Sequence, residues 1–231
     1  MDYVHQFAQF KHHKQTNMKT IEEIINENGY TLDYLKSGSP IFQSKNMYTF
    51  SSDSTALAGF VKNEKIGTLV DLCSGSGIVG LEVIDRIQTD KLVLVEFQLE
   101  LAKMSECSAR FNKSKTKINV INADINNLEN YMKSGDADVV VCNPPYFKVG
   151  SGYKPVNESR ALARHEINLT LKTLIEKVNY ILKPDGDFYL VHILDRLPEI
   201  EKLLNHNNFK IIEKKVLNGK LERVLVYAKK L

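Results

Sequence analysis

The chain has 231 residues, of which 43% are hydrophobic and 26% are charged, and its formal net charge is +3. These values are typical of one folded domain with a buried core, so they exclude a collagen-like, mucin-like or wholly disordered chain. No apolar run approaches the roughly 20 residues that span a bilayer, so we expect no membrane partner. The N-terminal Met-Asp-Tyr-Val-His lacks the basic and apolar regions of a signal peptide.

Three cysteines, Cys73, Cys107 and Cys142, form an odd number without a C-x-x-C spacing. We therefore expect no disulfide framework, no bound metal and a reducing, cytoplasmic location.

Basic residues gather in three stretches, 110–117, 148–165 and 209–231. These stretches can attract a polyanion or simply form a solvated basic surface. The sequence does not determine the oligomeric state, for which the monomer is favoured.

The first 65 residues show short and mixed patterns. Residues 1–19 lack periodicity and are expected to form an arm or a frayed helix. The run Thr20-Ile-Glu-Glu23 fits a capping box, which predicts a short helix that ends at Gly29. Strands around residues 30–34 and 41–43 are expected to pair across a turn, and Ser52 is expected to cap a helix through about Val61.

From residue 67, strand and helix patterns alternate regularly. Strands are predicted at residues 68–72, 91–97, 118–123, 137–142 and 187–193, and helices at 78–87, 98–112, 125–132, 164–182 and 197–205. Two closing strands, 209–216 and 224–229, flank a hairpin-type turn at Asn218-Gly219. Because this alternation needs crossover connections, we predict a Rossmann-like, doubly wound α/β fold with a mostly parallel seven-stranded sheet whose last strand is antiparallel.

A glycine-rich turn follows the first of these strands, where the sequence reads Asp71-Leu-Cys73-Ser-Gly75-Ser-Gly77. Glycines let the backbone approach a ligand closely, and the start of the next helix offers unpaired N–H groups. Many α/β turns contain two glycines, but the strand–turn–helix context favours a ligand-binding loop here.

Carboxylates follow the next two strands. Glu96 ends the second strand, where an acid can accept hydrogen bonds from both ribose hydroxyls of a nucleoside, although a solitary acid at a strand end needs no such role. Asp124 follows the third strand and can accept from an adenine amino group or cap the helix that starts at Ile125. These two roles are compatible because a carboxylate has two oxygens.

The fourth strand runs into Asn143-Pro-Pro-Tyr146. Prolines after a strand often only end it, and a tyrosine there can be plain packing. However, the turn, both acids and this run all follow neighbouring parallel strands, at the sheet edge where open α/β proteins bind ligands. The sequence therefore predicts a ligand site at this edge.

Together these features resemble a class I S-adenosylmethionine-dependent amino-methyltransferase, and the resemblance covers about residues 45–231. Within that group the chain looks like the bacterial tRNA(Val) adenine-N6 methyltransferase (YfiC-like) family, which modifies the adenine just after the anticodon. The run Phe50-Ser-Ser-Asp53 before a helix supports this assignment. One departure is Cys73, where such loops more often carry glycine.

The resemblance implies a methyltransferase domain over residues 51–231, with residues 1–50 as an extension packed on or near the active site. It implies tRNA as the partner and S-adenosylmethionine as the cofactor, with cofactor contacts assigned to Asp71, Cys73, Gly75, Gly77, Glu96, Asp124 and Asn143. Substrate contacts are assigned to Pro145, Phe147, Lys148, Lys154, Arg160 and Arg164, in a loop expected to close over the RNA.

Adenine N6 is a poor nucleophile because its lone pair is delocalised into the ring. We expect the Asn143 side-chain oxygen and the Pro144 carbonyl to accept both N6 hydrogens while Tyr146 stacks on the base, which assigns catalytic roles to these three residues. Positioning rather than a strong base then supplies most of the rate. Cys73 and Cys142 are interpreted as small packed residues, not as nucleophiles.

Other activities share parts of this pattern. A glutamine-N5 methyltransferase acting on release factors also carries Asn-Pro-Pro-Tyr, but it has a larger helical N-terminal domain than about 50 residues can form. A guanine-N2 rRNA methyltransferase remains open. A DNA adenine methyltransferase usually needs a target-recognition domain, for which the chain has no room. A non-catalytic RNA-binding module is disfavoured by the intact set of cofactor positions.

Overall fold

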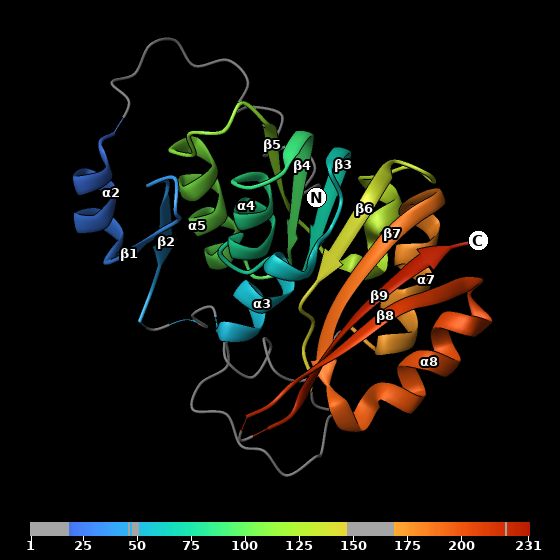
Figure 1. The fold of residues 1–231 in the computed structure, drawn as a ribbon. Coiled ribbons are helices and arrows are strands. Elements are labelled where there is room, and N and C mark those ends of the chain that lie inside the picture. Colours follow the sequence, from blue (N-terminus) through green and yellow to red (C-terminus); the bar gives the residue numbers. More distant parts are fainter. Residues whose placement is uncertain (1–18, 46, 48–50, 147–168, 220) are drawn as a thin grey trace.

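The chain folds as a seven-stranded sheet with helices on both faces (Figure 1). The computed structural model describes residues 19–45, 47, 51–146, 169–219 and 221–231. The strands of the large sheet are β3 (Lys65–Leu72), β4 (Gln88–Glu96), β5 (Lys117–Asn122), β6 (Ala137–Cys142), β7 (Leu182–Ile193), β8 (Phe209–Leu217) and β9 (Arg223–Lys230). The helices around it are α3 (Ser52–Phe60), α4 (Ile78–Ile84), α5 (Leu99–Arg110), η2 (Ile125–Asn130), α7 (Leu171–Ile181), η3 (Leu194–Arg196) and α8 (Leu197–His206).

The strands lie in the order β5-β4-β3-β6-β7-β9-β8. Strands β3 to β7 pair in parallel, whereas β9 pairs antiparallel with both β7 and β8. The chain builds outward from β3 to β5 and then continues on the other side of β3 with β6, which creates a topological switch point between β3 and β6. The predicted doubly wound sheet with an antiparallel last strand is therefore confirmed, and β9 is inserted between its two neighbours.

The central strands are buried on both faces, which explains their continuous apolar sequences. Leu69, Val70, Leu94 and Val141 have no exposed surface. One face of the sheet packs against α3 and α4, and the other packs against η2, α7 and α8. None of the described helices is long and apolar enough to cross a membrane.

A small N-terminal unit packs beside the large sheet. It consists of α2 (Ile21–Asn28) and a hairpin of β1 (Thr31–Tyr34) and β2 (Pro40–Gln43). The predicted capping box and the left-handed Gly29 (φ 65°) at the end of the helix are both present. The hairpin lies against α5, where the Phe42 N–H donates to Ser108 Oγ at 2.9 Å. The expected arm at residues 1–19 falls almost wholly outside the described residues, and the domain division near residue 50 stays a prediction.

Several predicted boundaries are wrong. Strands β3 and β4 begin three residues earlier than predicted, at Lys65 and Gln88, and α4 ends three residues earlier, at Ile84. Three further differences concern α3, α7 and β7. The α3 helix begins at Ser52 with Ser51 as its N-cap residue, one position before the expected cap. The α7 helix begins at Leu171 and not near Arg164, because the Thr170 side chain caps it by accepting from the Thr173 N–H at 3.1 Å. Strand β7 begins at Leu182 instead of near residue 187, since pairing with Ala137 overrides the turn signal of the Pro-Asp-Gly run that follows.

Close packing of α4 on the sheet yields a stability prediction. A Cβ atom added at Gly80 would lie 2.8 Å from Leu92 Cδ1 and 2.9 Å from Leu94 Cδ2, so Gly80→Ala should destabilise the protein by about 1–3 kcal/mol despite the better helix propensity of alanine. Gly59 in α3 has no atom within 4 Å of an added Cβ, so Gly59→Ala should be neutral or stabilising by about 1 kcal/mol. Urea unfolding of both variants measures the difference, and equal stabilities would contradict this account of the packing.

Candidate active site

The predicted site residues follow strands that end at the same edge of the sheet. Leu72 in β3 is paired with Val95 in β4 and with Cys142 in β6. The next residues of these three strands are Cys73, Glu96 and Asn143, so the register brings the glycine-rich loop, the acid and the Asn-Pro-Pro-Tyr run together. The β8–β9 hairpin extends past the sheet at this same end (Figure 1).

The loop after β3 uses left-handed backbone conformations at alternating positions. Cys73, Gly75 and Gly77 have φ values of 57°, 58° and 85°. A Cβ at Gly77 would lie 2.9 Å from Leu94 Cδ1, so glycine is required there by packing. A Cβ at Gly75 would meet no atom of the described residues within 4 Å. The loop therefore presents open backbone at Gly75, as a ligand-binding turn needs, and Cys73 adopts the conformation that glycine would adopt more easily.

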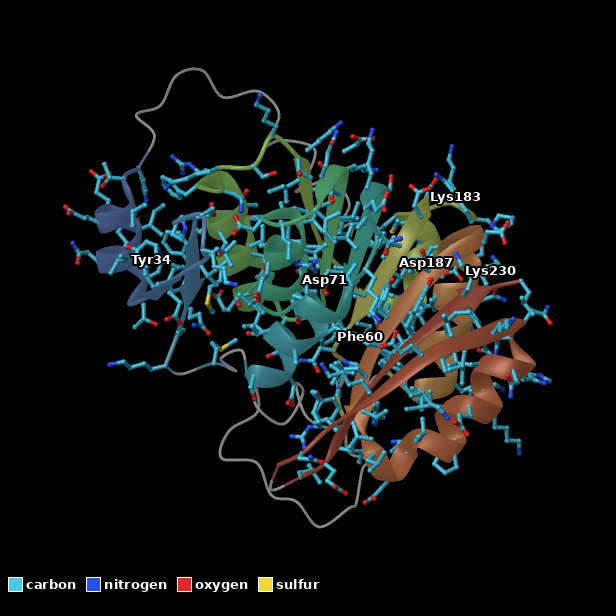
Figure 2. The ribbon with its side chains drawn as sticks, in the orientation of Figure 1. Tyr34, Phe60, Asp71, Lys183, Asp187 and Lys230 are labelled. Atoms are coloured by element: carbon cyan, nitrogen blue, oxygen red, sulfur yellow. The ribbon has the colours of Figure 1, made fainter. Side chains whose placement is uncertain are left out.

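Asp71 lies in the interior and holds the start of α4 (Figure 2). Its Oδ2 accepts the Gly80 N–H at 2.8 Å, which satisfies a helix N–H that the N-cap residue Gly77 cannot reach with a side chain. Its Oδ1 is buried and has no hydrogen-bond partner among the described residues. Burial, opposed by the Gly80 hydrogen bond and reinforced by the nearby Glu96, raises the pKa of Asp71 to about 8. Asp71 supports the loop from beneath, and its assignment as a direct cofactor ligand stays a prediction.

Glu96 joins the loop to the start of α5. Its Oε2 accepts the Gly75 N–H and its Oε1 accepts the Gln98 N–H, both at 2.8 Å. Burial raises the pKa of Glu96, while these backbone N–H groups oppose the rise. Each carboxylate oxygen has a second lone pair, so the side chain retains acceptor capacity for hydroxyl groups of a ligand.

Asp124 caps η2, as one of its two expected roles requires. Its Oδ1 accepts the Asn126 N–H at 2.9 Å and the Asn126 Nδ2 at 2.7 Å. Both bonds use the same oxygen, so the capping role is compatible with a ligand contact through the other oxygen. Glu96 and Asp124 are the neighbouring carboxylates of the site, because β4 and β5 end side by side with Glu96 opposite Asn122.

Asn143 and Tyr146 are held by polar side chains from two other elements, α3 and β9. Asn143 Nδ2 donates to Ser54 Oγ at 3.0 Å, and the Tyr146 hydroxyl donates to Asn143 Oδ1 at 2.6 Å. The Tyr146 hydroxyl also lies 3.3 Å from Asp53 Oδ2, which accepts from Arg223 Nε at 2.9 Å. The Arg223 guanidinium lies over the Tyr146 ring at 5.1 Å.

Sequence reasoning missed four members of this region: Ser54, His192, Arg223 and Arg196, whose Nη1 donates to the Tyr146 carbonyl oxygen at 3.4 Å. His192 ends buried strand β7, and its ring centroid lies 5.2 Å from that of Tyr146. Burial lowers the pKa of His192 to about 3, so its imidazole is neutral. Its Nδ1 accepts the Ile193 N–H at 2.9 Å, and its Nε2 is buried with no hydrogen-bond partner in the part of the chain that the structure describes. A polar residue inside an apolar strand was the signal that could have identified it.

The cysteines Cys73 and Cys142 lie together at the ends of β3 and β6. Burial, followed by a hydrogen bond with the Cys73 thiol, raises the pKa of Cys142 well above its usual range. A thiol with a raised pKa forms little of the nucleophilic thiolate. The pair therefore acts as packing between the loop and the Asn-Pro-Pro-Tyr segment.

The basic stretches occupy different places. Residues 111–116 connect α5 to β5 at the amino ends of the strands, opposite the site, and the Lys113 backbone N–H donates to Ser39 Oγ at 3.1 Å. In β8, Lys214 pairs with Glu201 of α8 at 2.6 Å. Phe147, Lys148, Lys154, Arg160 and Arg164, assigned to substrate contacts, lie outside the described residues. Pro144 is buried and Pro145 half-buried beside Asn143.

Comparisons with known proteins bear on the family and the fold of the chain. A family model described as the methyltransferase small domain matches residues 41–217. A tRNA1(Val) (adenine(37)-N6)-methyltransferase of Shewanella baltica is 24% identical over 165 residues, which cover 70% of this chain and 67% of the relative. The protein of the same name from Photobacterium profundum is 26% identical over 153 residues, which cover 65% of this chain and 61% of the relative. The chain thus aligns with about two thirds of the length of these relatives.

Solved structures share the fold at low sequence identity. The M. jannaschii tRNA m1G37 methyltransferase has a TM-score of 0.63 and 14% identity, and covers 87% of this chain and 56% of its own. P. horikoshii TYW2, solved in complex with MeSAdo, has a TM-score of 0.60 and 12% identity, and covers 87% of this chain and 70% of its own. At these identities the likeness supports the fold alone.

The buried Asp71 carboxyl makes stability depend on pH. Its pKa is about 8 in the folded protein against an ordinary value of 3.8, so the folded state holds this proton more tightly than the unfolded state. The free energy of unfolding should therefore fall as the pH rises from about 4 to about 8. Asp71→Asn imitates the protonated acid and should make this fall shallower, as measured by urea unfolding across the range. An unchanged slope, equal to that of the exposed control Asp90→Asn, would contradict the assignment.

Proposed function

The chain belongs to the methyltransferase small domain family, and on this premise we propose that it methylates the exocyclic N6 of an adenine in tRNA. More narrowly, we propose an adenine in the anticodon loop of tRNA(Val), because the relatives reported above carry the name tRNA1(Val) (adenine(37)-N6)-methyltransferase. The supporting observation within this chain is the position of Asn143, held at the end of β6 beside the glycine-rich loop.

We propose S-adenosylmethionine as the cofactor. The residues fit such a ligand because the backbone at Gly75 faces open space and two carboxylates, Glu96 and Asp124, follow the adjoining strands. Glu96 would accept hydrogen bonds from the ribose hydroxyls, and Asp124 would accept one from the adenine amino group. The loop 73–77 would contact the rest of the cofactor. When bound, the sulfonium compound supplies an electrophilic methyl group.

The Asn-Pro-Pro-Tyr segment provides acceptors for a substrate amino group. Asn143 Oδ1 and the Pro144 carbonyl can each accept one of the two N6 hydrogens, which favours a tetrahedral nitrogen with an available lone pair. The hydrogen bonds to Ser54 and to the Tyr146 hydroxyl hold the amide at both of its ends. Fixed acceptors of this kind need no reorganisation during the reaction.

No strong base is required for this chemistry. The nearest imidazole among the described residues, His192, is buried beside Tyr146 with a pKa near 3, so it is a weak base. The product ammonium-like nitrogen is acidic enough to lose its proton to water after transfer. The site therefore works by orienting the amino group and by excluding competing contacts.

Transfer of radiolabel from S-adenosylmethionine tests the proposed substrate class. Unmodified bulk tRNA should become labelled in the presence of the protein, whereas purified release factor should not. Label in the release factor and none in tRNA would contradict the proposal and favour glutamine-N5 methylation. Labelled ribosomal RNA with unlabelled tRNA would favour the guanine-N2 alternative.

Replacement of Glu96 tests the cofactor site. Glu96→Ala should weaken binding of S-adenosylmethionine by about 1–3 kcal/mol, because it removes charge-assisted hydrogen bonds to the ribose and a support of the Gly75 N–H. Isothermal titration calorimetry measures the change. Glu100→Ala removes a neighbouring exposed acid that pairs with Lys103 and should leave the affinity unchanged. Equal affinities of both variants would contradict the ribose role.

Replacement of Asn143 tests the reaction itself. Asn143→Ala should slow methyl transfer on the order of 100-fold or more at saturating tRNA and cofactor, while tRNA affinity changes little, because the contact strengthens in the transition state. The exposed Asn119 of β5 offers a matched control, and Asn119→Ala should react at the wild-type rate. A nearly normal rate for Asn143→Ala would reduce the Asn-Pro-Pro-Tyr run to a strand stop.

A further inference from the structure

Hydroxyl groups hold the Asn143 side chain at both ends of its amide. Its Nδ2 donates to Ser54 Oγ at 3.0 Å, and its Oδ1 accepts the Tyr146 hydroxyl hydrogen at 2.6 Å. The second bond engages the same oxygen that the proposed reaction needs as an acceptor. A substrate amino group must therefore share this oxygen with Tyr146 or displace the tyrosine hydrogen from it.

The Tyr146 hydroxyl has a second acceptor within reach. A phenol carries one hydrogen, so Tyr146 donates to one acceptor at a time. Asn143 Oδ1 lies 2.6 Å from the hydroxyl oxygen, and Asp53 Oδ2 lies 3.3 Å from it. Rotation about the phenol C–O bond redirects the hydrogen from Asn143 to Asp53 without any movement of the ring.

Asp53 is suited to receive this hydrogen. It lies in the first turn of α3, where the helix dipole favours a negative charge, and its oxygen also accepts from Arg223 Nε at 2.9 Å. The Asp53 and Arg223 side chains are only 14% and 19% exposed, so water competes weakly for the pair. A hydrogen bond to a carboxylate is about twice as strong as one to a neutral amide. Because Arg223 already shares this oxygen, the resting hydroxyl stays with Asn143.

Arg223 also holds the Tyr146 ring in place while its hydroxyl hydrogen rotates. Its guanidinium lies 5.1 Å from the centroid of the Tyr146 ring, within the range of a cation–π contact. The same side chain thus binds Asp53 through Nε and the tyrosine through its planar group. Arg223 thereby holds the Asp53 carboxylate and the Tyr146 ring in fixed positions relative to each other.

We propose that Asp53 is a positioning residue that takes the Tyr146 hydroxyl hydrogen bond when a substrate amino group donates to Asn143 Oδ1. The proposal rests on the proposed function, because it requires an amino-group substrate at Asn143. No covalent bond forms or breaks in this exchange, and the hydrogen remains on the Tyr146 oxygen. The exchange leaves Asn143 Oδ1 free to serve the reaction.

A double-mutant cycle in single-turnover kinetics tests the exchange. Asp53→Ala should slow methyl transfer about tenfold, the size of one charge-assisted hydrogen bond, because the hydroxyl then remains on Asn143. Tyr146→Phe keeps the ring but removes the competing hydrogen, so its own rate serves as the reference for the second half of the cycle. In the Tyr146→Phe background, Asp53→Ala should then slow the reaction less than about threefold. Equal losses in both backgrounds would overturn the proposal and leave Asp53 as a support of the fold.

Two double-mutant cycles in unfolding without ligand, Tyr146→Phe with Asp53→Ala and Tyr146→Phe with Asn143→Ala, separate this role from a structural one. The free energy of unfolding should show stronger coupling between Tyr146 and Asn143 than between Tyr146 and Asp53, since the resting hydrogen bond joins the first pair. The reverse order would overturn the proposal. Asp90→Ala breaks an exposed ion pair with Lys65 at the far end of the sheet. It should change neither the rate of methyl transfer nor the coupling energies in unfolding. If the wild-type protein methylates no RNA, the proposed function fails, and the unfolding cycle still decides the resting contact.

Discussion

The parallel pairing of β3 with β4 and β6 is the constraint on which the site depends. Leu72 is opposite Val95 on one side and Cys142 on the other. A slip of one residue in either pairing would turn the following side chain to the other face of the sheet. Glu96 could then no longer accept from Gly75, and Asn143 could no longer donate to Ser54. The buried apolar residues of these strands fix the register and therefore the site.

Two buried carboxylates convert this edge of the sheet into a rigid loop. Asp71 accepts the Gly80 N–H beneath the loop, and Glu96 accepts the Gly75 N–H beside it. Burial raises the pKa of both acids, so their desolvation costs stability that the backbone hydrogen bonds offset in part. Such a cost is characteristic of functional sites, where a fixed arrangement of polar groups matters more than the last increment of stability. These hydrogen bonds give the loop its fixed geometry.

The sequence was sufficient for the sheet but not for the polar cluster around Tyr146. Doubly buried strands are continuous apolar runs, and the turn at Asn218-Gly219 signals the antiparallel return of β9, so local patterns carry this information. The ion pair between Asp53 and Arg223 joins residues 170 positions apart, and Arg223 is indistinguishable in sequence from other members of a basic stretch. The conformation of Cys73 could not be predicted from its residue type either. Its left-handed φ of 57° is set by the surrounding loop and not by the preference of cysteine.

The central claim is that one site at the carboxyl ends of β3, β4 and β6 directs a methyl group onto an adenine amino group. Mass spectrometry of nucleosides from tRNA treated with the protein and S-adenosylmethionine tests it most directly. We expect a new N6-methyladenosine that disappears with Asn143→Ala. A methylated guanosine, or a methyl group on a ring nitrogen of adenine, would contradict it, because neither product requires an acceptor pair for an exocyclic adenine amino group.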